Sequence, residues 1–157
     1  MGLCRRLILC CCGLALWATP GAAQRPLTVQ GTRSLTFGTL LAGVNKAVLR
    51  TDAINGGQFD INGPSRASVQ LTFTLPASMA GPGGATLPLS FGPNDGGWSP
   101  PQQIATQTGF DPRVPFTAPL DQNGKVSAYI GGTAQPTANQ KAGSYTGTIT
   151  LTVVVLP

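Results

Sequence analysis

Apolar and polar residues alternate along several short stretches of the chain, and the last stretch is the longest. Its odd positions between 143 and 156 carry the apolar residues Tyr145, Ile149, Leu151, Val153 and Val155. Most of its even positions carry threonine or serine. Because successive side chains of a strand point to opposite faces, the pattern predicts one long strand with an apolar face and a threonine face. Val154 and Leu156 make the second face apolar near the end, so we expect another segment to cover that end.

Shorter stretches upstream show the same alternation and are separated by Gly, Pro, Asn and Asp. They cover residues 27–29, 35–40, 48–50, 59–61, 69–75, 87–91 and 126–130. Pro88 has no N–H to donate, which predicts that its strand lies at a sheet edge or turns its N–H side to solvent. Residues 121–124 read Asp-Gln-Asn-Gly, a hairpin turn signal. The Pro- and Gly-rich region 92–121 predicts long loops with at most short strands.

These patterns together indicate the fold class. No stretch repeats its apolar residues with a sustained helical period. Several short strands, turn signals between them and no helices predict an all-β, antiparallel β-sandwich. The residues expected to point into its core are Phe37, Leu71, Phe73, Ile149 and Leu151.

The first 23 residues are predicted to be a signal peptide. Arg5 and Arg6 form a basic start, and the apolar run over 7–19 is too short to span a bilayer. The small residues at 21–23 predict cleavage before Gln24. We therefore expect one β-sandwich domain over 24–157, exported to the periplasm, the cell surface or the extracellular space. We expect no transmembrane anchor in the mature chain.

The predicted leader holds all four cysteines, so the mature domain would have no disulfide. Subtracting Arg5 and Arg6 from the ten basic residues leaves eight against five aspartates, which gives the mature chain a net charge of +3. These basic residues are scattered, and nothing in their arrangement indicates a nucleic-acid-binding face.

The mature chain contains few groups that catalyse reactions. It has no His, Cys or Glu, which removes the usual general base, the thiol nucleophile and most metal ligands. An aspartate-only hydrolase is the remaining enzymatic alternative, and no spacing pairs its five aspartates. We therefore expect a protein that is not an enzyme and that uses no cofactor or metal.

The region 92–121 supports an alternative function as a self-contained sandwich that binds a glycan or a protein. The candidate binding residues there are Asn94, Asp95, Trp98 and Arg113. Loops of a rigid scaffold often carry binding residues. The structural alternative, which we favour, is that Trp98, Phe110 and Phe116 pin these loops over the core.

Three stretches resemble a bacterial family of secreted domains of unknown function. Residues 35–40, Leu-Thr-Phe-Gly-Thr-Leu, resemble its "LdFG" opening, and residues 75–77, Leu-Pro-Ala, resemble its central segment. Residues 130–133, Ile-Gly-Gly-Thr, followed by Gln-Lys-Ala-Gly-Ser-Tyr-Thr-Gly-Thr at 140–148, resemble its "vGGtl … qaaGtYsGtftvtV" end. This family is similar to the spore-coat-U-type and chaperone–usher pilin subunits.

The resemblance implies an incomplete immunoglobulin-like, pilin-like sandwich that a neighbouring subunit completes by adding a strand. It implies a structural or adhesive surface protein whose partners are a periplasmic chaperone and an outer-membrane usher, or like subunits. Residues 24–33 are the candidate donor strand, with Leu27, Val29 and Gly31 alternating. The acceptor groove is expected beside the last strand, at Val153, Val154, Val155 and Leu156. The competing interpretation makes residues 24–33 an ordinary strand of their own sandwich.

Overall fold

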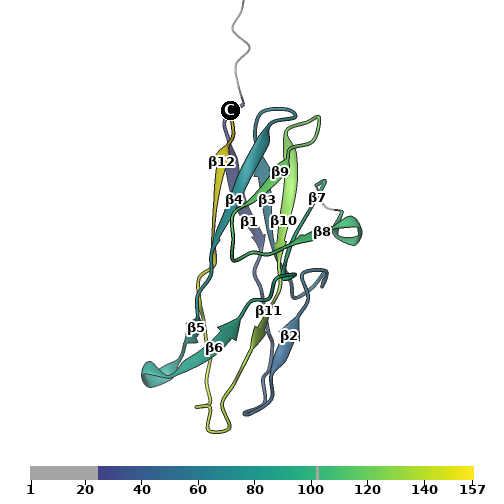
Figure 1. Ribbon diagram of the computed structural model, residues 1–157. Helices are drawn as coiled ribbons and strands as arrows, with labels where there is room; N and C mark the ends of the chain where they lie inside the picture. The colour runs from purple at the N-terminus through teal and green to yellow at the C-terminus, as the bar shows by residue number, and fades with distance from the viewer. Residues whose placement is uncertain (1–24, 102) are drawn as a thin grey trace, which may run out of the picture.

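The computed structural model describes residues 25–101 and 103–157 (Figure 1). The predicted signal peptide and Gln24 lie outside these residues. The strands are β1 (Thr28–Arg33), β2 (Lys46–Val48), β3 (Gly57–Asn62), β4 (Ser68–Thr74), β5 (Ser78–Ala80), β6 (Thr86–Ser90), β7 (Gly96–Ser99), β8 (Thr108–Phe110), β9 (Phe116–Pro119), β10 (Lys125–Ile130), β11 (Gly132–Ala134) and β12 (Thr150–Val155). Two short 3-10 turns, η1 (Pro82–Gly84) and η2 (Ile104–Thr106), lie between them. No helix in the described part is long and apolar enough to cross a membrane.

All strand pairs are antiparallel, which confirms the predicted all-β fold. Half of the molecule is a sandwich of two sheets, β1-β3-β10-β7-β8 and β12-β4-β9. The other half is built on the sheet β2-β11-β6-β5. Only Gly131 separates β10 from β11, so one continuous segment of chain runs through both halves. Residue 25 and the C-terminus lie at the same end of this elongated body (Figure 1).

The core lies between the two sheets of the sandwich. Leu71 and Phe73 of β4 and Leu151 of β12 face Ile61 of β3 and the even positions of β10. Phe37 is buried in a second cluster in the other half. The core predictions are therefore confirmed, with Ile149 partly buried against the main cluster.

Two predicted strands are shorter or absent. The last strand begins only at Thr150, because its partner β4 ends at Thr74 and Pro76 follows with no N–H to continue the ladder. Pairing resumes as a single bridge between Ala80 and Thr146. The predicted strand over 35–40 is wrong: this segment joins no ladder, and Gly38 has a φ of +63° that no strand adopts.

The predictions for Pro88 and for the turn at 121–124 also need correction. Pro88 does not mark a sheet edge, because β6 lies between β11 and β5. Its carbonyl accepts a hydrogen bond from the N–H of Gln135 at 2.9 Å, and its missing N–H ends the ladder with β11 at that point. The turn at 121–124 forms, with the Asp121 carboxylate accepting from the N–H of Asn123 and Lys125 at 2.8 and 2.7 Å. It is not a hairpin, however, since it connects β9 and β10 of opposite sheets.

Candidate strand-binding groove

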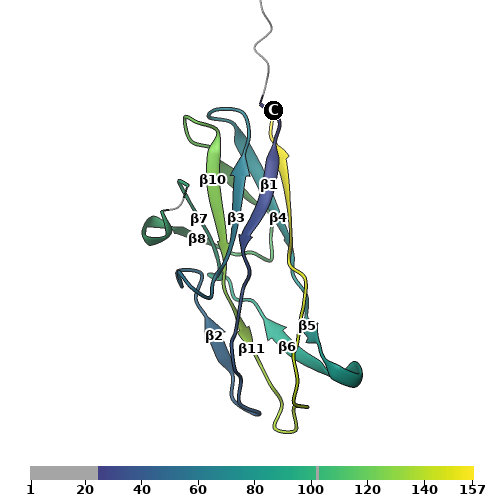
Figure 2. The same ribbon diagram turned by 180° about the vertical axis from the view of Figure 1, so that it is seen from behind.

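The first and last strands of the described chain are both edge strands. β1 pairs with β3 alone and β12 pairs with β4 alone, so each has one free edge within the described part of the molecule. The two strands lie side by side in different sheets and run in opposite directions (Figures 1 and 2). The sandwich is therefore not closed along this side.

The chain segments that continue from these two strands are unpaired over much of their length. Residues 34–45 belong to no strand, and residues 147–149 lie outside the ladder of β12. In the segment 34–45, the N–H of Thr36 bonds to the carbonyl of Asn55 at 2.8 Å. Between Leu35 and Ile149 lies a cavity of about 380 Å³ that Phe59 and Ile130 of the core also line.

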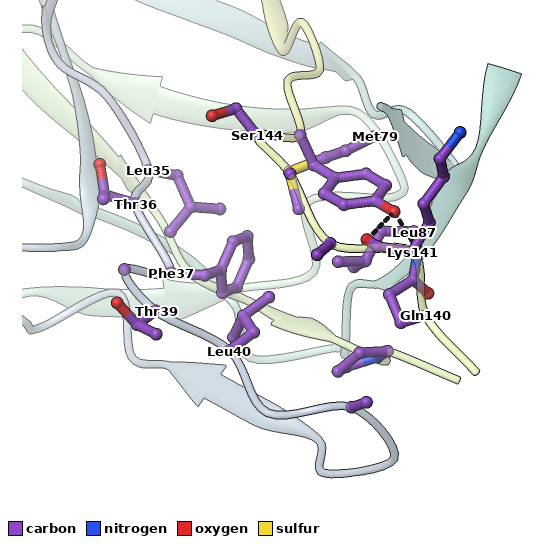
Figure 3. Close-up of a pocket in the computed structure, with 16 residues that line it drawn as sticks. Leu35, Thr36, Phe37, Thr39, Leu40, Met79, Leu87, Gln140, Lys141 and Ser144 are labelled. Carbon is purple, nitrogen blue, oxygen red and sulfur yellow. Dashed lines mark hydrogen bonds between the residues drawn. The ribbon is translucent and has the colours of Figure 1, made fainter. Parts of the chain in front are cut away.

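A larger cavity of about 690 Å³ continues from it, with Leu35 common to both. It lies between residues 35–42 on one side and residues 140–145 on the other. Leu35, Phe37 and Leu40 point into this cavity while Thr36 and Thr39 point away (Figure 3). Apolar side chains from the second core cluster, Met79 and Leu87, also line it. We call the two cavities together the edge groove.

The second wall of the edge groove is fixed by Tyr145. Its hydroxyl donates to the carbonyl of Lys141 at 2.6 Å and accepts from the side-chain amide of Gln140 at 2.6 Å (Figure 3). The same amide donates to the carbonyl of Thr86 at 3.1 Å. The bond to Thr86 ties residues 140–145 to β6, and the bonds of Tyr145 fix the conformation of that segment.

The edge groove presents features to which an extended chain can bind. Its floor is apolar, and its walls present backbone groups outside any ladder, which an added strand can pair with. Lys141 is the charged residue among those that line the larger cavity. Within residues 25–101 and 103–157, no group of three or more metal-ligating side chains gathers.

Most of the chain matches a known family. A family model described as "Domain of unknown function (DUF4402)" matches residues 27–154. The chain belongs to this family. No curated protein matches it. Residues 35–40, 75–77, 130–133 and 140–148, which carried the resemblance in the sequence, all lie inside the matched range.

The DUF4402 domain uses the predicted donor residues in its own sheet. Val29 and Gly31 of β1 pair opposite Ile61 and Phe59 of β3. Leu27 is partly buried against the core, whereas Val29 is 38% exposed. In the single chain, β1 is thus an ordinary edge strand, as the competing interpretation has it. The exchange of this strand between subunits stays a prediction.

The predicted acceptor residues lie on β12 and at its end. Val153 packs partly buried against the core, and Leu156 is half-buried with its N–H bonded to the carbonyl of Ser68 at 2.9 Å. Val154 and Val155 are 52% and 36% exposed, so no segment of the described chain fully covers them. Val153, Val154, Val155 and Leu156 do not line the edge groove, whose lining ends just before β12 at residues 147–149.

The side chains of the 92–121 region are mostly engaged within the domain, as the favoured interpretation predicts. Phe110 stacks on Phe116 with ring centroids 4.4 Å apart, and Trp98 lies 6.4 Å from Phe116. The Asp95 carboxylate accepts from the N–H of Gly92 at 2.7 Å. The Asn94 carbonyl accepts from the guanidinium of Arg50 at 2.9 Å.

Arg113 is also engaged locally. Its guanidinium forms an ion pair with Asp111 at 2.7 Å, and the side-chain hydrogen bond from Arg113 lowers the pKa of the Asp111 carboxyl to about 2. The structure thus does not bring Asn94, Asp95, Trp98 and Arg113 together around either cavity of the edge groove.

Sequence reasoning missed most of the groove itself. Residues 35–40 and 143–149 alternate as strands do, but Gly38 adopts a positive φ, and both segments lie outside any ladder except for the bridge at Thr146. One signal was available: two of the family motifs coincide with these two walls. Motifs that resemble a family yet fit no strand or turn are candidates for a binding surface.

Proposed function

We propose that this DUF4402 domain is an exported structural or adhesive subunit, not an enzyme, and that it assembles by β-strand addition. One observation carries the proposal: a groove with apolar side chains on its floor runs between residues 35–42 and 140–149, and the adjoining strands β1 and β12 each have a free edge. A strand placed there covers apolar side chains and pairs with backbone groups on both sides.

The resemblance to spore-coat-U-type pilins supports the same reading from the sequence. A subunit with an unfilled groove needs a partner until assembly, because an open apolar edge promotes aggregation. A periplasmic chaperone and an outer-membrane usher, or further subunits, are the partners that this resemblance suggests. The predicted signal peptide would deliver the domain to the compartment where they act.

The donor we favour is residues 24–33 of a second subunit. β1 is suited to exchange because five of its six residues are exposed. An arginine on each side of β1 helps to attach it to the domain. Arg25 donates to the carbonyl of Asn123 at 3.0 Å, and Arg33 donates to the carbonyls of Ala53 and Gly56. Release of β1 therefore costs backbone hydrogen bonds and little buried apolar area.

The experiment is size-exclusion chromatography of the mature chain, isolated from a periplasm, with mass identification of whatever elutes with it. We expect oligomers or a bound partner. A variant lacking residues 24–33 should stay folded, lose self-assembly and bind a peptide of that sequence. A peptide with Leu27→Asp and Val29→Asp serves as the control and should not bind.

Two results would contradict the proposal. One is a mature chain that elutes alone as a monomer at every concentration. The other is a deletion variant that unfolds and is not restored by the peptide, because residues 24–33 would then belong permanently to their own sandwich.

A further inference from the structure

A second cavity, of about 470 Å³, lies on the outer face of the sandwich, away from the core. Its sheet wall comes from β1, β3 and β10. Phe59 and Ile61 of β3 point into the core, so Gln58 and Asp60, which alternate with them along the strand, point outward. We call this cavity the outer hollow.

The outer hollow has one polar wall and one apolar wall. Thr32, Gln58 and Asp60 supply the polar wall. Ala53, from the loop between β2 and β3, and Ile104 of η2 supply apolar groups. Tyr129 of β10, which is fully buried, lines it next to Gln58, its partner in the ladder.

The carboxylate of Asp60 is oriented by its neighbours. Its Oδ1 accepts from the side-chain amide of Gln58 at 3.0 Å and from the hydroxyl of Ser127 at 2.7 Å. These two bonds to Oδ1 fix the orientation of the Asp60 carboxylate. The carbonyl oxygen of the Gln58 amide and the Thr32 hydroxyl add further hydrogen-bonding capacity to the same wall.

The rim of the hollow is fixed before any ligand arrives. Arg33 donates to the carbonyls of Gly56 and Ala53, the latter at 2.8 Å, and so ties the end of β1 to the loop before β3. Its Nη2 is buried and has no hydrogen-bond partner in the described chain. The Asp52 carboxylate accepts from the N–H of Ile54 and of Asn55 at 2.8 and 2.9 Å, which closes that loop. A preorganised site loses less conformational entropy on binding.

From these features we infer that the outer hollow is a binding site for a neutral saccharide. A sugar ring presents hydroxyl groups at its edge and C–H groups on its faces, which match the polar and apolar walls. A cation is disfavoured because the charge of Arg33 offsets that of Asp60 in the same hollow, although no ion pair joins them in the described chain. The volume lies within the roughly 300–1,000 Å³ usual for small-molecule sites.

The hollow shares Thr32 and Arg33 of β1 with the smaller cavity of the edge groove, whereas Gln58 and Asp60 line the hollow and neither cavity of the groove. Changes at Gln58 and Asp60 therefore report on the hollow, and the inference applies to the domain with β1 in its own sheet. Its test is saturation-transfer NMR of the mature chain with methyl glycosides of glucose, galactose, mannose and N-acetylglucosamine, and with n-butylammonium as a cationic probe. Amide shifts of a labelled protein then locate the site. We expect at least one glycoside to shift residues 58–60 without shifting residues 37–40 of the groove.

Substitutions in the hollow test which side chains contact the glycoside. Asp60→Asn and Thr32→Ala should each weaken glycoside binding, the former by about tenfold because a hydrogen bond to a charged group is lost. Asp111→Asn, whose ion pair is exposed and which does not line the hollow, should leave binding unchanged. Thr32 is exposed and its hydroxyl makes only a long bond, to the backbone carbonyl of Gln58 at 3.4 Å, so its truncation should disturb folding little.

Four results would overturn the inference. Three are no glycoside binding at all, binding that neither variant weakens, and tighter binding of n-butylammonium than of any glycoside. The fourth is a set of amide shifts confined to the edge groove, which would assign the ligand to that other site.

Discussion

The ring of Tyr145 lies directly on Gly81, so that any side chain at Gly81 would overlap the ring. Gly81 follows β5, and its neighbour Ala80 forms the bridge to Thr146, with reciprocal N–H to carbonyl bonds of 2.7 and 2.9 Å. The glycine thus allows the C-terminal segment to approach β5 closely, and the approach sets the position of one wall of the edge groove.

Replacing Gly81 with alanine should therefore displace the ring and loosen this wall. We expect a loss of about 1–3 kcal/mol in the free energy of unfolding, the usual cost of overpacking. Urea denaturation measures it. Gly31→Ala is the matched control, since its new Cβ would meet only Phe59 at an ordinary 3.7 Å. Equal stability of the two variants would mean that Tyr145 moves aside freely and does not fix the wall.

The two faces of the β4–β12 pair should respond differently to truncation. Phe73→Ala removes a ring that is 8% exposed and packs against Phe59 and Phe110, and it should cost about 3–5 kcal/mol. Thr150→Ala on the exposed opposite face should cost less than about 0.5 kcal/mol. Similar losses from both variants in urea denaturation would show that the strand register is wrong.

Stability should fall in acid as the turn after β2 loses its charged cap. The pKa of Asp52 is lowered from 3.8, chiefly by hydrogen bonds from the backbone and then the side chain of Asn55. A folded pKa below the unfolded one adds stability that is present above 3.8 and is lost as the pH falls through the folded value. Asp52→Asn should thus be less stable than the native chain at neutral pH, and the difference should shrink in acid.

Carboxyl chemical shifts followed by NMR through the same titration check the cause directly. Asp52 should titrate below 3.8 and Asp111 near 2. The difference in stability between Asp52→Asn and the native chain should shrink below the pKa of Asp52. If it stayed the same there, the charge of the Asp52 carboxylate would not be its source.

The sequence predicted a strand correctly where apolar and polar residues alternate and only the apolar face can be buried. Leu71 and Phe73 of β4 alternate with polar residues, so a slip by one residue would bury the polar face. The pattern at 143–149 looks equally clean. It fails because strand formation there depends on the partner, and the partner carries Pro76, a residue far away in the sequence.

The candidate site was only partly predictable for a similar reason. The need for a segment to cover the end of β12 was predicted, because Val154 and Leu156 make its second face apolar. The groove also requires residues 35–42 to lie opposite residues 140–145, because these two segments form its walls. That proximity arises from the sheet order, which places β1 and β12 beside each other in different layers, and local patterns do not encode sheet order.

The central claim is that the edge groove accepts an added strand, and residue-resolved amide hydrogen exchange tests it most directly. The mature chain is measured alone and with an excess of a peptide of residues 24–33. The account predicts that most amides over 35–42 and 147–149 exchange quickly in the free chain and become protected with the peptide, while those of β4 stay protected throughout. Unchanged exchange in both segments, or a change confined to β3 as the peptide replaces β1, would contradict it.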